Sequence, residues 1–284
     1  KMAKDADTLP LLIGYVDDDN ADVRFAITSV LIGTHDDRAI PVLLNCLNSD
    51  SDKNVRRNAI DALYKYPREM LSRQPYTESL PTFSRYGMRW DENSYKAILI
   101  LGDIGGIPER ECLRGFMKEL LTLQGLMGDP SALVPKKDNE VMRDLRKRGL
   151  YDRRMILLPR AKTACIKALF KLGDEETEKI ILAALTDENV LGRAVASEAL
   201  AYAERKDLLK NLFPLLKDER DVTAHEYAMY ANPGGASYRR VCDVAIDAIS
   251  DLTEQPFSFR AFRDRPFRYM DEYVQEVKVY SESL

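Results

Sequence analysis

The clearest pattern in this sequence is an apolar stretch, an acidic turn and a second apolar stretch, which recurs along the chain. In the first copy, Leu9–Leu12 opens the first stretch, Asp17–Asp19 forms the turn, and the second stretch ends at Leu31. Apolar residues spaced four apart lie on one face of a helix, so each stretch predicts a helix with one buried face. The pattern therefore predicts helix pairs, each of which covers the apolar face of the next.

The second helix of each pair gives the most regular signal. Its last apolar residue lies at Leu31, Leu63, Leu101, Leu169, Leu200 and Ile249, and the residue four positions earlier is Ile27, Ala59, Ala97, Cys165, Ala196 and Ala245. Apart from the first, these earlier residues are small. A small residue on a buried face lets a neighbouring helix approach closely, so we expect the second helices to pack side by side.

Prolines and glycines mark the ends of the predicted helices. Pro10 and Pro41 fit the first turn of a helix, where no backbone N–H bond is lost. Gly33, Gly102 and Gly173 follow the last apolar residues of three second helices, where a glycine commonly ends a helix.

These features resemble HEAT repeats, in particular the short HEAT-like units of phycobilisome lyases. The resemblance lies in the apolar-Pro-x-Leu starts, the acidic turns at Asp17, Asp50, Asp187 and Asp218, and the Val-Arg steps at 23–24 and 55–56, with Arg193 in the equivalent place. It implies a structural ladder in which each arginine bonds the turn aspartate of an adjacent repeat. Three repeats depart from it, with Ser94, Lys162 and Cys242 at the arginine position.

The sequence predicts an all-α protein, a right-handed α–α superhelix (a HEAT-like solenoid) of about six helix pairs with two long insertions and a C-terminal cap. We expect a single domain over residues 1–284, with repeats at about 7–37, 38–68, 75–106, 107–174, 175–205 and 206–252, and a cap at 253–284. Within these repeats, individual helices are expected at 109–124, 140–148, 238–249 and 269–280.

The two insertions, at 125–158 and 222–237, interrupt the fourth and sixth repeats. Each lies between the first and second helix of its repeat, a connection that always emerges on the same edge of a solenoid. We therefore expect two long loops on one edge, where insertions in repeat proteins often mark the binding face. The alternative is surface decoration without function, which is tolerated because long loops cost little entropy.

The first insertion is basic within an acidic protein. It provides the candidate partner-binding residues Arg143, Arg146, Lys147 and Arg148, which would suit an acidic protein or a phosphate group. The alternative is a solvated charged face, partly neutralised by the acidic residues between them.

The second insertion combines tyrosines with glycines and one histidine. His225, Tyr227, Tyr230 and Tyr238 are candidate partner-binding residues, because tyrosine offers a large contact area with few rotors to immobilise. The alternative is a loop folded back on its own repeat.

Beyond Leu252 the chain changes character, and residues 256–268 alternate phenylalanines with arginines. The aromatic rings are expected to cover the open end of the last repeat while the arginines face water. The alternative is a docking site built from the same residues.

Composition narrows the classes of function. The net charge is −4 and the pI about 5.5, which argues against nucleic acid as the main partner because phosphate binding needs a basic surface. No run of about 18 apolar residues is present, so we expect no membrane span.

The four cysteines, Cys46, Cys112, Cys165 and Cys242, are widely spaced and are expected to be free thiols, which favours a reducing, cytoplasmic compartment. Because the chain begins at Lys1-Met2, a removed signal peptide stays open as an alternative.

No residue pattern predicts catalysis, a metal or a cofactor. The chain has two histidines, His35 and His225, too few for a two-metal site, and its cysteines are not grouped for zinc. We therefore expect a monomeric, non-catalytic scaffold that binds another protein through its concave face and its loop edge. Two alternatives stay open: a lyase-like protein that binds a small ligand, and a nucleic-acid-binding protein that uses the basic insertion.

Overall fold

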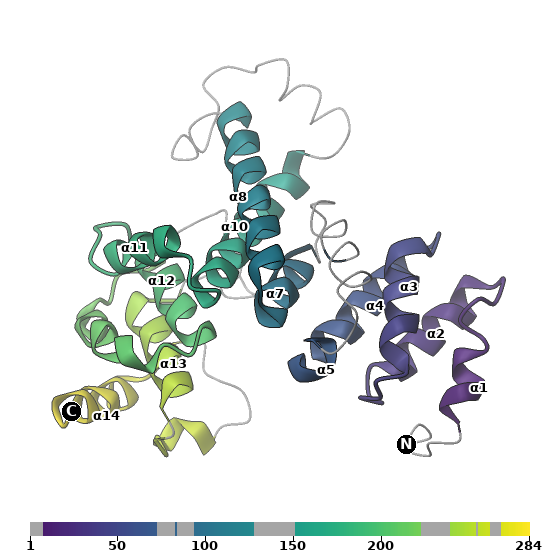
Figure 1. Cartoon of the computed structure of the whole chain (residues 1–284). Helices are drawn as coiled ribbons and strands as arrows, with labels where there is room; N and C mark the ends of the chain where they lie inside the picture. The colour runs from purple at the N-terminus through teal and green to yellow at the C-terminus, as the bar shows by residue number, and fades with distance from the viewer. Residues whose placement is uncertain are drawn as a thin grey trace. The chain divides into compact units, whose positions relative to one another are not determined.

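The computed structural model describes residues 8–72, 83, 94–127, 151–222, 239–253, 255–261 and 268–284 (Figure 1). Every regular element in these ranges is a helix, and the only β-type pairing among them is a single antiparallel bridge between Asp221 and Arg240. The predicted all-α solenoid is therefore confirmed.

The chain forms two compact units, Lys1–Ala168 and Leu169–Leu284, and their boundary lies inside one helix. The expectation of one domain stays a prediction.

The first unit holds a row of paired helices. They are α1 (Leu9–Ile13), α2 (Ala21–Leu31), α3 (Ala39–Ser49), α4 (Lys53–Lys65), α5 (Arg68–Ser72), α7 (Ser94–Ile104), α8 (Ile107–Met127) and most of α10 (Tyr151–Lys171). Helix α3 packs on α4 within a pair, whereas α2 packs on α4 and α4 on α7 between pairs. The second helices of consecutive pairs thus lie side by side, as the small-residue pattern predicts.

The second unit repeats this arrangement with different first helices. It contains α11 (Glu175–Ala184), α12 (Val190–Tyr202), the 3₁₀ helix η2 (Lys206–Lys217), α13 (Val241–Leu252), η4 (Ser258–Ala261) and α14 (Asp271–Glu282). The second helices α12 and α13 pack against each other, and η2 packs on both. Residues 206–217 form a 3₁₀ helix with Pro214 inside it. Pro214 alone does not account for this form, because α10 is an α-helix and contains Pro159.

The residues that mark the second helices form the core. Leu31, Leu63, Leu101, Leu169, Leu200 and Ile249 are all buried, and so are Ile27, Ala59, Ala97, Cys165, Ala196 and Ala245. Both residues of each pair are thus buried, as expected for positions four apart on one helical face.

Side chains in the turns cap the helices that follow. Asn20 begins α2, Asp52 begins α4 and Asn189 begins α12, and each accepts a backbone N–H of the first turn through its side-chain oxygen. Such caps satisfy N–H groups that have no partner inside the helix. The acidic and amide residues of the turns therefore have a structural role.

One of the predicted glycine stops differs from the structure. Gly173 follows α10 with φ of +68°, as expected for a glycine stop. Gly102, in contrast, is buried inside α7, which continues to Ile104 and ends before Gly105 (φ +77°). The predicted helices over 109–124, 238–249 and 269–280 correspond to α8, α13 and α14, and the one at 140–148 lies outside the described residues.

A ladder of arginines joins consecutive turns. Arg24 in α2 donates from Nε to Asp50 Oδ2 at 2.8 Å and from Nη2 to Asp50 Oδ1 at 3.0 Å. Its Nη1 donates to the carbonyl oxygens of Asp18 and Asp19 in its own turn, at 2.7 and 3.2 Å. One guanidinium thus fixes its own turn and binds the turn of the next repeat.

The same arrangement recurs elsewhere with fewer bonds. Arg56 in α4 donates to the carbonyl oxygens of Asp50 and Ser51 at 2.6 and 2.9 Å. In the second unit Arg193 Nη1 lies 3.0 Å from Asp218 Oδ2, but its buried Nε has no partner among the described atoms. The Arg193–Asp218 pair is therefore the weaker version of the Arg24–Asp50 pair.

The pKa values of Asp50 and Asp218 are shifted in opposite directions. Burial alone would raise the pKa of Asp50, but the hydrogen bonds from Arg24 and from the backbone N–H of Asp52 lower it below its ordinary value. Burial raises the pKa of Asp218, and the charge of Arg193 offsets this only in part. A bidentate partner compensates a partly buried carboxylate better than a single contact does.

The last helix lies over the sixth repeat. Phe257 and Phe259 are buried and stacked, with ring centroids 5.2 Å apart, and Tyr280 of α14 meets Phe257 edge-on at 5.5 Å. Helix α14 packs on η2 and on α13. The remaining phenylalanines of this segment, Phe262 and Phe267, lie outside the described residues.

The ladder yields a stability prediction. Arg24→Ala removes four hydrogen bonds and leaves Asp50 without its charge partner, at side-chain exposures of 12% and 5%. We expect the melting temperature of the first unit to fall by about 5 °C, as for loss of a partly buried charge pair. Circular dichroism measures this. The control is Arg38→Ala, which removes an exposed pair with Asp36 (52% and 30%) and should change the melting temperature by less than about 2 °C. An equal fall in melting temperature for Arg24→Ala and Arg38→Ala would contradict the proposed contribution of the Arg24–Asp50 pair to stability.

A second prediction concerns a buried acid at the start of α8. Glu109 is 1% exposed, its Oε2 has no hydrogen-bond partner among the described residues, and a Cβ at Gly106 would stand only 2.5 Å from that oxygen. Burial raises the pKa of Glu109 above its ordinary 4.5, and the bond from its own backbone N–H lowers it only in part.

Because the folded state holds this proton more tightly than the unfolded state, the stability of the protein should fall as the pH rises from about 4.5 through the higher folded pKa. Glu109→Gln abolishes that contribution. We expect the variant to gain roughly 1 kcal/mol over the wild type at pH 7 and little at pH 4, measured by urea unfolding. A difference that does not depend on pH would show that Glu109 is not the titrating group.

Candidate functional site

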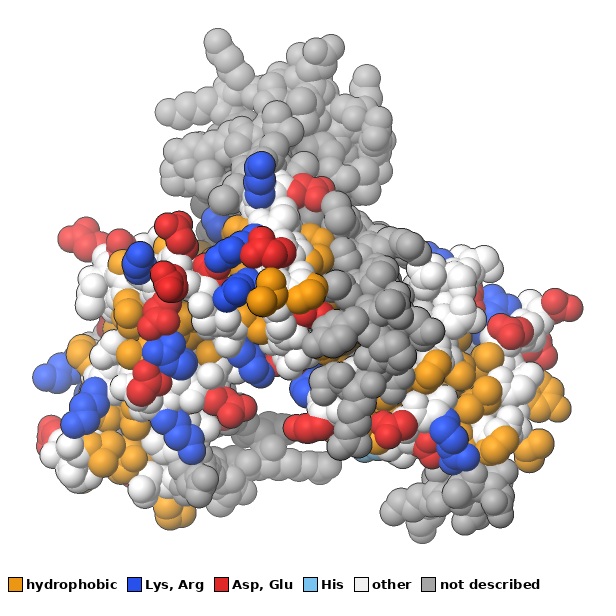
Figure 2. All heavy atoms as spheres, viewed as in Figure 1, with side chains coloured by type: hydrophobic (Ala, Val, Ile, Leu, Met, Phe, Trp, Pro, Cys, Tyr) orange, Lys and Arg blue, Asp and Glu red, His pale blue; other side chains and the backbone are white. Residues whose placement is uncertain are grey.

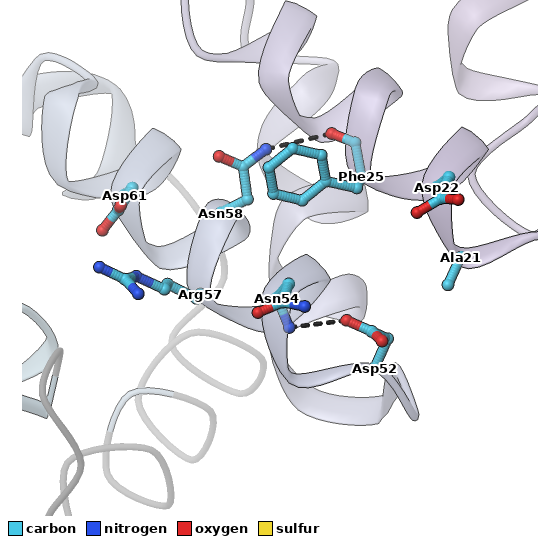
Figure 3. A pocket seen from close by; sticks show the side chains of 8 residues that line it. All are labelled: Ala21, Asp22, Phe25, Asp52, Asn54, Arg57, Asn58 and Asp61. Carbon is cyan, nitrogen blue, oxygen red and sulfur yellow. Dashed lines mark hydrogen bonds between the residues drawn. The ribbon is translucent and has the colours of Figure 1, made fainter.

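An open groove of about 410 Å³ lies where the second helices of the first two repeats, α2 and α4, meet (Figure 3). We call it the α2–α4 groove. It is lined by Ala21, Asp22, Phe25, Asp52, Asn54, Arg57, Asn58 and Asp61. The lining therefore combines one aromatic ring with several carboxylates and amides and one arginine.

Asn58 holds the two helices together at the floor of the groove. Its Nδ2 donates to Thr28 Oγ1 at 2.9 Å, to Ser29 Oγ at 2.7 Å and to the carbonyl oxygen of Phe25 at 3.2 Å. An amide nitrogen has two hydrogens, so these three acceptors share them. The oxygen of the same amide, Oδ1, accepts no hydrogen bond from the described residues, and it is not among the buried atoms that lack a partner.

Phe25 is displayed rather than buried. Its side chain is 43% exposed. In Figure 3 it lies beside the amide of Asn58, which occupies the contact between α2 and α4. Leu11, Tyr15 and Val30 are the other large apolar side chains exposed in the first repeat. Figure 2 shows apolar side chains at the surface of the α1–α4 part, among acidic and basic ones.

The carboxylates of the groove differ in how they are used. Asp52 Oδ1 caps α4 by accepting the N–H groups of Asn54 and Val55, at 2.7 and 3.3 Å. Asp61 forms an ion pair with Lys96 of α7. The side chains of Asp22 and Asn54 are exposed and make no hydrogen bond or ion pair with the described residues. Among the carboxylates that line the groove, Asp22 is therefore the one that binds no described residue.

Beyond Asp61 the polar surface continues along the next second helix. Lys96 lies 5.8 Å from the centroid of the Tyr95 ring, and the Arg160 guanidinium lies 5.9 Å from the same ring. Burial raises the pKa of Tyr95, and the charge of Arg160 lowers it in part. The groove is thus acidic at its α2 end, and the cations Lys96 of α7 and Arg160 of α10 lie beyond Asp61.

A second pocket, of about 390 Å³, lies on the turns themselves. Asp17, Asp18, Asp19 and Asp50 line it together with Arg24. Its polar groups already bind one another through the arginine ladder and through Asp18 Oδ1, which accepts the backbone N–H of Asn20 at 2.8 Å. This pocket is a structural part of the ladder rather than a candidate site.

The candidate residues chosen from the sequence cannot be compared with this groove. Arg143, Arg146, Lys147, Arg148, His225, Tyr227, Tyr230 and Tyr238 all lie outside the described residues. The base of the second insertion is described: Val222 N–H donates to the Arg239 carbonyl at 2.8 Å, and Val241 N–H donates to the Arg220 carbonyl at 3.1 Å. The insertion therefore leaves and re-enters the sixth repeat at one place.

Sequence reasoning missed the groove residues, although two signals were present. An asparagine next to Ala59 in the middle of a helix is unfavourable unless its amide has a tertiary role. Phe25 follows the Val-Arg step and precedes the buried Ile27, so it falls outside the apolar stripe.

The described residues contain no group of three or more His, Cys, Asp or Glu that could hold a metal ion. In the same part of the chain no helix is both long and apolar enough to cross a membrane. The four cysteines are free thiols, with Cys46, Cys165 and Cys242 buried and Cys112 partly exposed.

Stacked helix pairs joined by a turn ladder define this molecule as a helical-repeat protein. Residues 2–66 match the family model described as HEAT repeats, and this match includes both helices of the groove. The predicted resemblance to HEAT repeats is confirmed over these residues, and the phycobilisome-lyase type is not shown. A search of curated proteins finds no match to the chain.

The thiols give a chemical prediction. Burial raises the pKa of Cys46 and of Cys242 to about 11, and it raises the pKa of Cys165 as well. Since the thiolate is the reactive form, we expect these three to react with iodoacetamide at pH 8 at least about 100-fold more slowly than Cys112. Mass spectrometry of timed samples measures each rate. In 8 M urea all four should react alike, and rapid native labelling of Cys46 would contradict the packing of α3.

Proposed function

We propose that this protein is a non-catalytic interaction scaffold whose contact surface on the first two repeats is the α2–α4 groove. HEAT repeats generally serve as protein-interaction scaffolds and are typically non-enzymatic. The proposal depends on one observation: the groove displays an exposed aromatic ring beside polar groups that the fold does not use.

The two insertions, at 125–158 and 222–237, form the second part of the proposed contact surface. The insertion at 222–237 lies between η2 and α13, whereas residues 125–127 and 151–158 of the first insertion belong to helices α8 and α10. The two insertions contain the candidate residues named above. Their role stays a prediction, separate from that of the groove.

Site-specific photo-crosslinking tests the scaffold proposal. A benzophenone amino acid at Asn54, which is exposed and lines the groove, should crosslink to a defined protein in the cells that produce this chain. The matched control carries the same group at Lys65, which is exposed at the other end of α4 and does not line the groove. The crosslinked protein is then purified and mixed with the full chain.

We expect a complex of defined stoichiometry by size-exclusion chromatography with light scattering. We expect crosslinking at Lys65 to be weaker by about tenfold, because side chains outside a contact are surrounded by water rather than by the partner. If no protein forms a complex with the full chain, the scaffold proposal is wrong. Equal crosslinking at the two positions would place the partner elsewhere on the chain.

A further inference from the structure

The side of α2 that faces away from α4 is an exposed apolar surface. In α4, Asn58 bonds α2, and Ala62 lies one turn later on the same side. Val30 of α2 corresponds to Ala62, because each directly precedes the last apolar residue of its helix. This position is 39% exposed at Val30, whereas it is buried in every other second helix, at Ala62, Ile100, Ala168, Ala199 and Ala248. Helix α2 thus presents a stacking face that the other second helices bury.

Two further residues belong to this face. Val23 and Ala26 lie seven and four positions before Val30, and we call the three residues the outer face of α2. Ala26 is exposed and Val23 half-buried, whereas their counterparts in α4, Asn58 and Val55, are buried. A repeat at the end of an array normally has a polar outer face, because nothing covers it. An apolar outer face therefore favours a further helix as its cover.

The turn beside this face carries an aspartate that lacks an arginine. Asp18 and Asp50 are equivalent, because each accepts through Oδ1 the backbone N–H two residues later at 2.8 Å. Their carbonyl oxygens also accept from the arginine of their own repeat, at 2.7 Å from Arg24 and 2.6 Å from Arg56. Asp50 in addition binds Arg24 of the preceding repeat through both oxygens and is 5% exposed. The side chain of Asp18 forms no ion pair with the described residues.

The contact between the first two repeats shows what such a surface binds. On the second repeat, the buried face of α4 and the carboxylate of Asp50 are covered together by one helix, α2, which carries Arg24 in its first turns. The first repeat offers the same two elements, the outer face of α2 and Asp18. Their fitting occupant is an α-helix with an arginine near its N-terminal end and small or apolar residues along the contact.

A second copy of the chain does not offer such a helix at an open end. The ladder arginines that reach an aspartate, Arg24 and Arg193, already bind Asp50 and Asp218 within the chain. The last second helix, α13, is packed against α14. These observations favour a helix from a different protein.

We propose that the outer face of α2 and the Asp18 carboxylate bind an α-helix of a partner protein, whose arginine pairs with Asp18 as Arg24 pairs with Asp50. This inference rests on the proposed scaffold function, and it adds a surface and the chemistry of the partner. Arginine suits this place better than lysine, because its planar guanidinium donates two parallel N–H groups to one carboxylate.

Fluorescence anisotropy with the full-length chain tests the proposal. The probe is a fluorescein-labelled peptide of residues 19–34, which contain α2, the chain's own example of a helix that binds such a face. A hydrocarbon bridge between positions 23 and 30, on the side away from α4, keeps it helical, because a free peptide of this length is a marginal helix. A matched probe carries citrulline, the uncharged isostere, in place of the arginine. We expect it to bind at least about tenfold more weakly.

Variants of the protein locate the binding. Asp18→Asn keeps an oxygen for the N–H of Asn20 but removes the charge, so it should weaken the arginine probe about tenfold and reduce the difference between the two probes. Val30→Lys places a charge on the outer face, and both probes should bind at least about tenfold more weakly. Neither residue is buried, so circular dichroism should show both variants folded.

Each variant has a matched control. Asp19→Asn removes the same charge from the neighbouring exposed residue of the turn, and Ile180→Lys makes the same kind of change at a side chain of α11 that is 59% exposed. Both should bind the arginine probe like the wild type. An equal loss with Asp18→Asn and Asp19→Asn would mean unspecific attraction to acidic residues, and the proposal would be wrong. Equal binding of the arginine and citrulline probes would overturn it as well.

The state of the chain alone tests the other occupant. If light scattering shows a dimer that Val30→Lys converts to a monomer, the outer face joins two copies and the proposed partner helix is wrong.

The partner from the crosslinking experiment separates this inference from the scaffold proposal. If that partner binds Asp18→Asn and Val30→Lys with wild-type affinity, the helix-docking site is wrong while the scaffold function stands. If it loses affinity for both variants but not for Asp19→Asn and Ile180→Lys, the helix-docking site is supported.

Discussion

The rest of this structure depends on the close contact between successive second helices. That contact is possible because Ala59, Ala97, Ala196 and Ala245 face it with almost no side chain, while leucines one turn later fill the space between. No helix pair could bury its apolar face alone, so each repeat is stable only against its neighbour. A larger residue at one of the alanine positions would separate two helices that carry both the core and the groove.

The polar turns fix how one repeat is oriented on the next. Arg24 shows this most completely, because one guanidinium bonds two carbonyl oxygens of its own turn and both oxygens of Asp50 in the next. At Arg193 the same design has lost part of its bonding, and Asp218 responds with a raised rather than a lowered pKa. The comparison indicates that the number of bonds to the guanidinium, and not its presence alone, decides how well a partly buried aspartate is compensated.

The groove arises where this regular packing changes. At Asn58 a polar side chain stands in the contact between α2 and α4, and it bonds the α2 backbone and two hydroxyl groups instead of packing. Phe25 lies beside it and is 43% exposed. A single amide in the contact between two second helices is thus accompanied by an exposed ring.

Periodicity by itself determined the helix pairs and the buried face of each second helix, because these features depend on local spacing. The arginine ladder was implied by the resemblance to HEAT repeats. It could not determine the end of α7, the 3₁₀ form of residues 206–217 or the groove. The choice of Asn58 as an anchor and of Phe25 as a displayed ring depends on which atoms of α2 lie opposite α4. This depends on how two helices pack against each other, so the residue spacing within one helix cannot predict it.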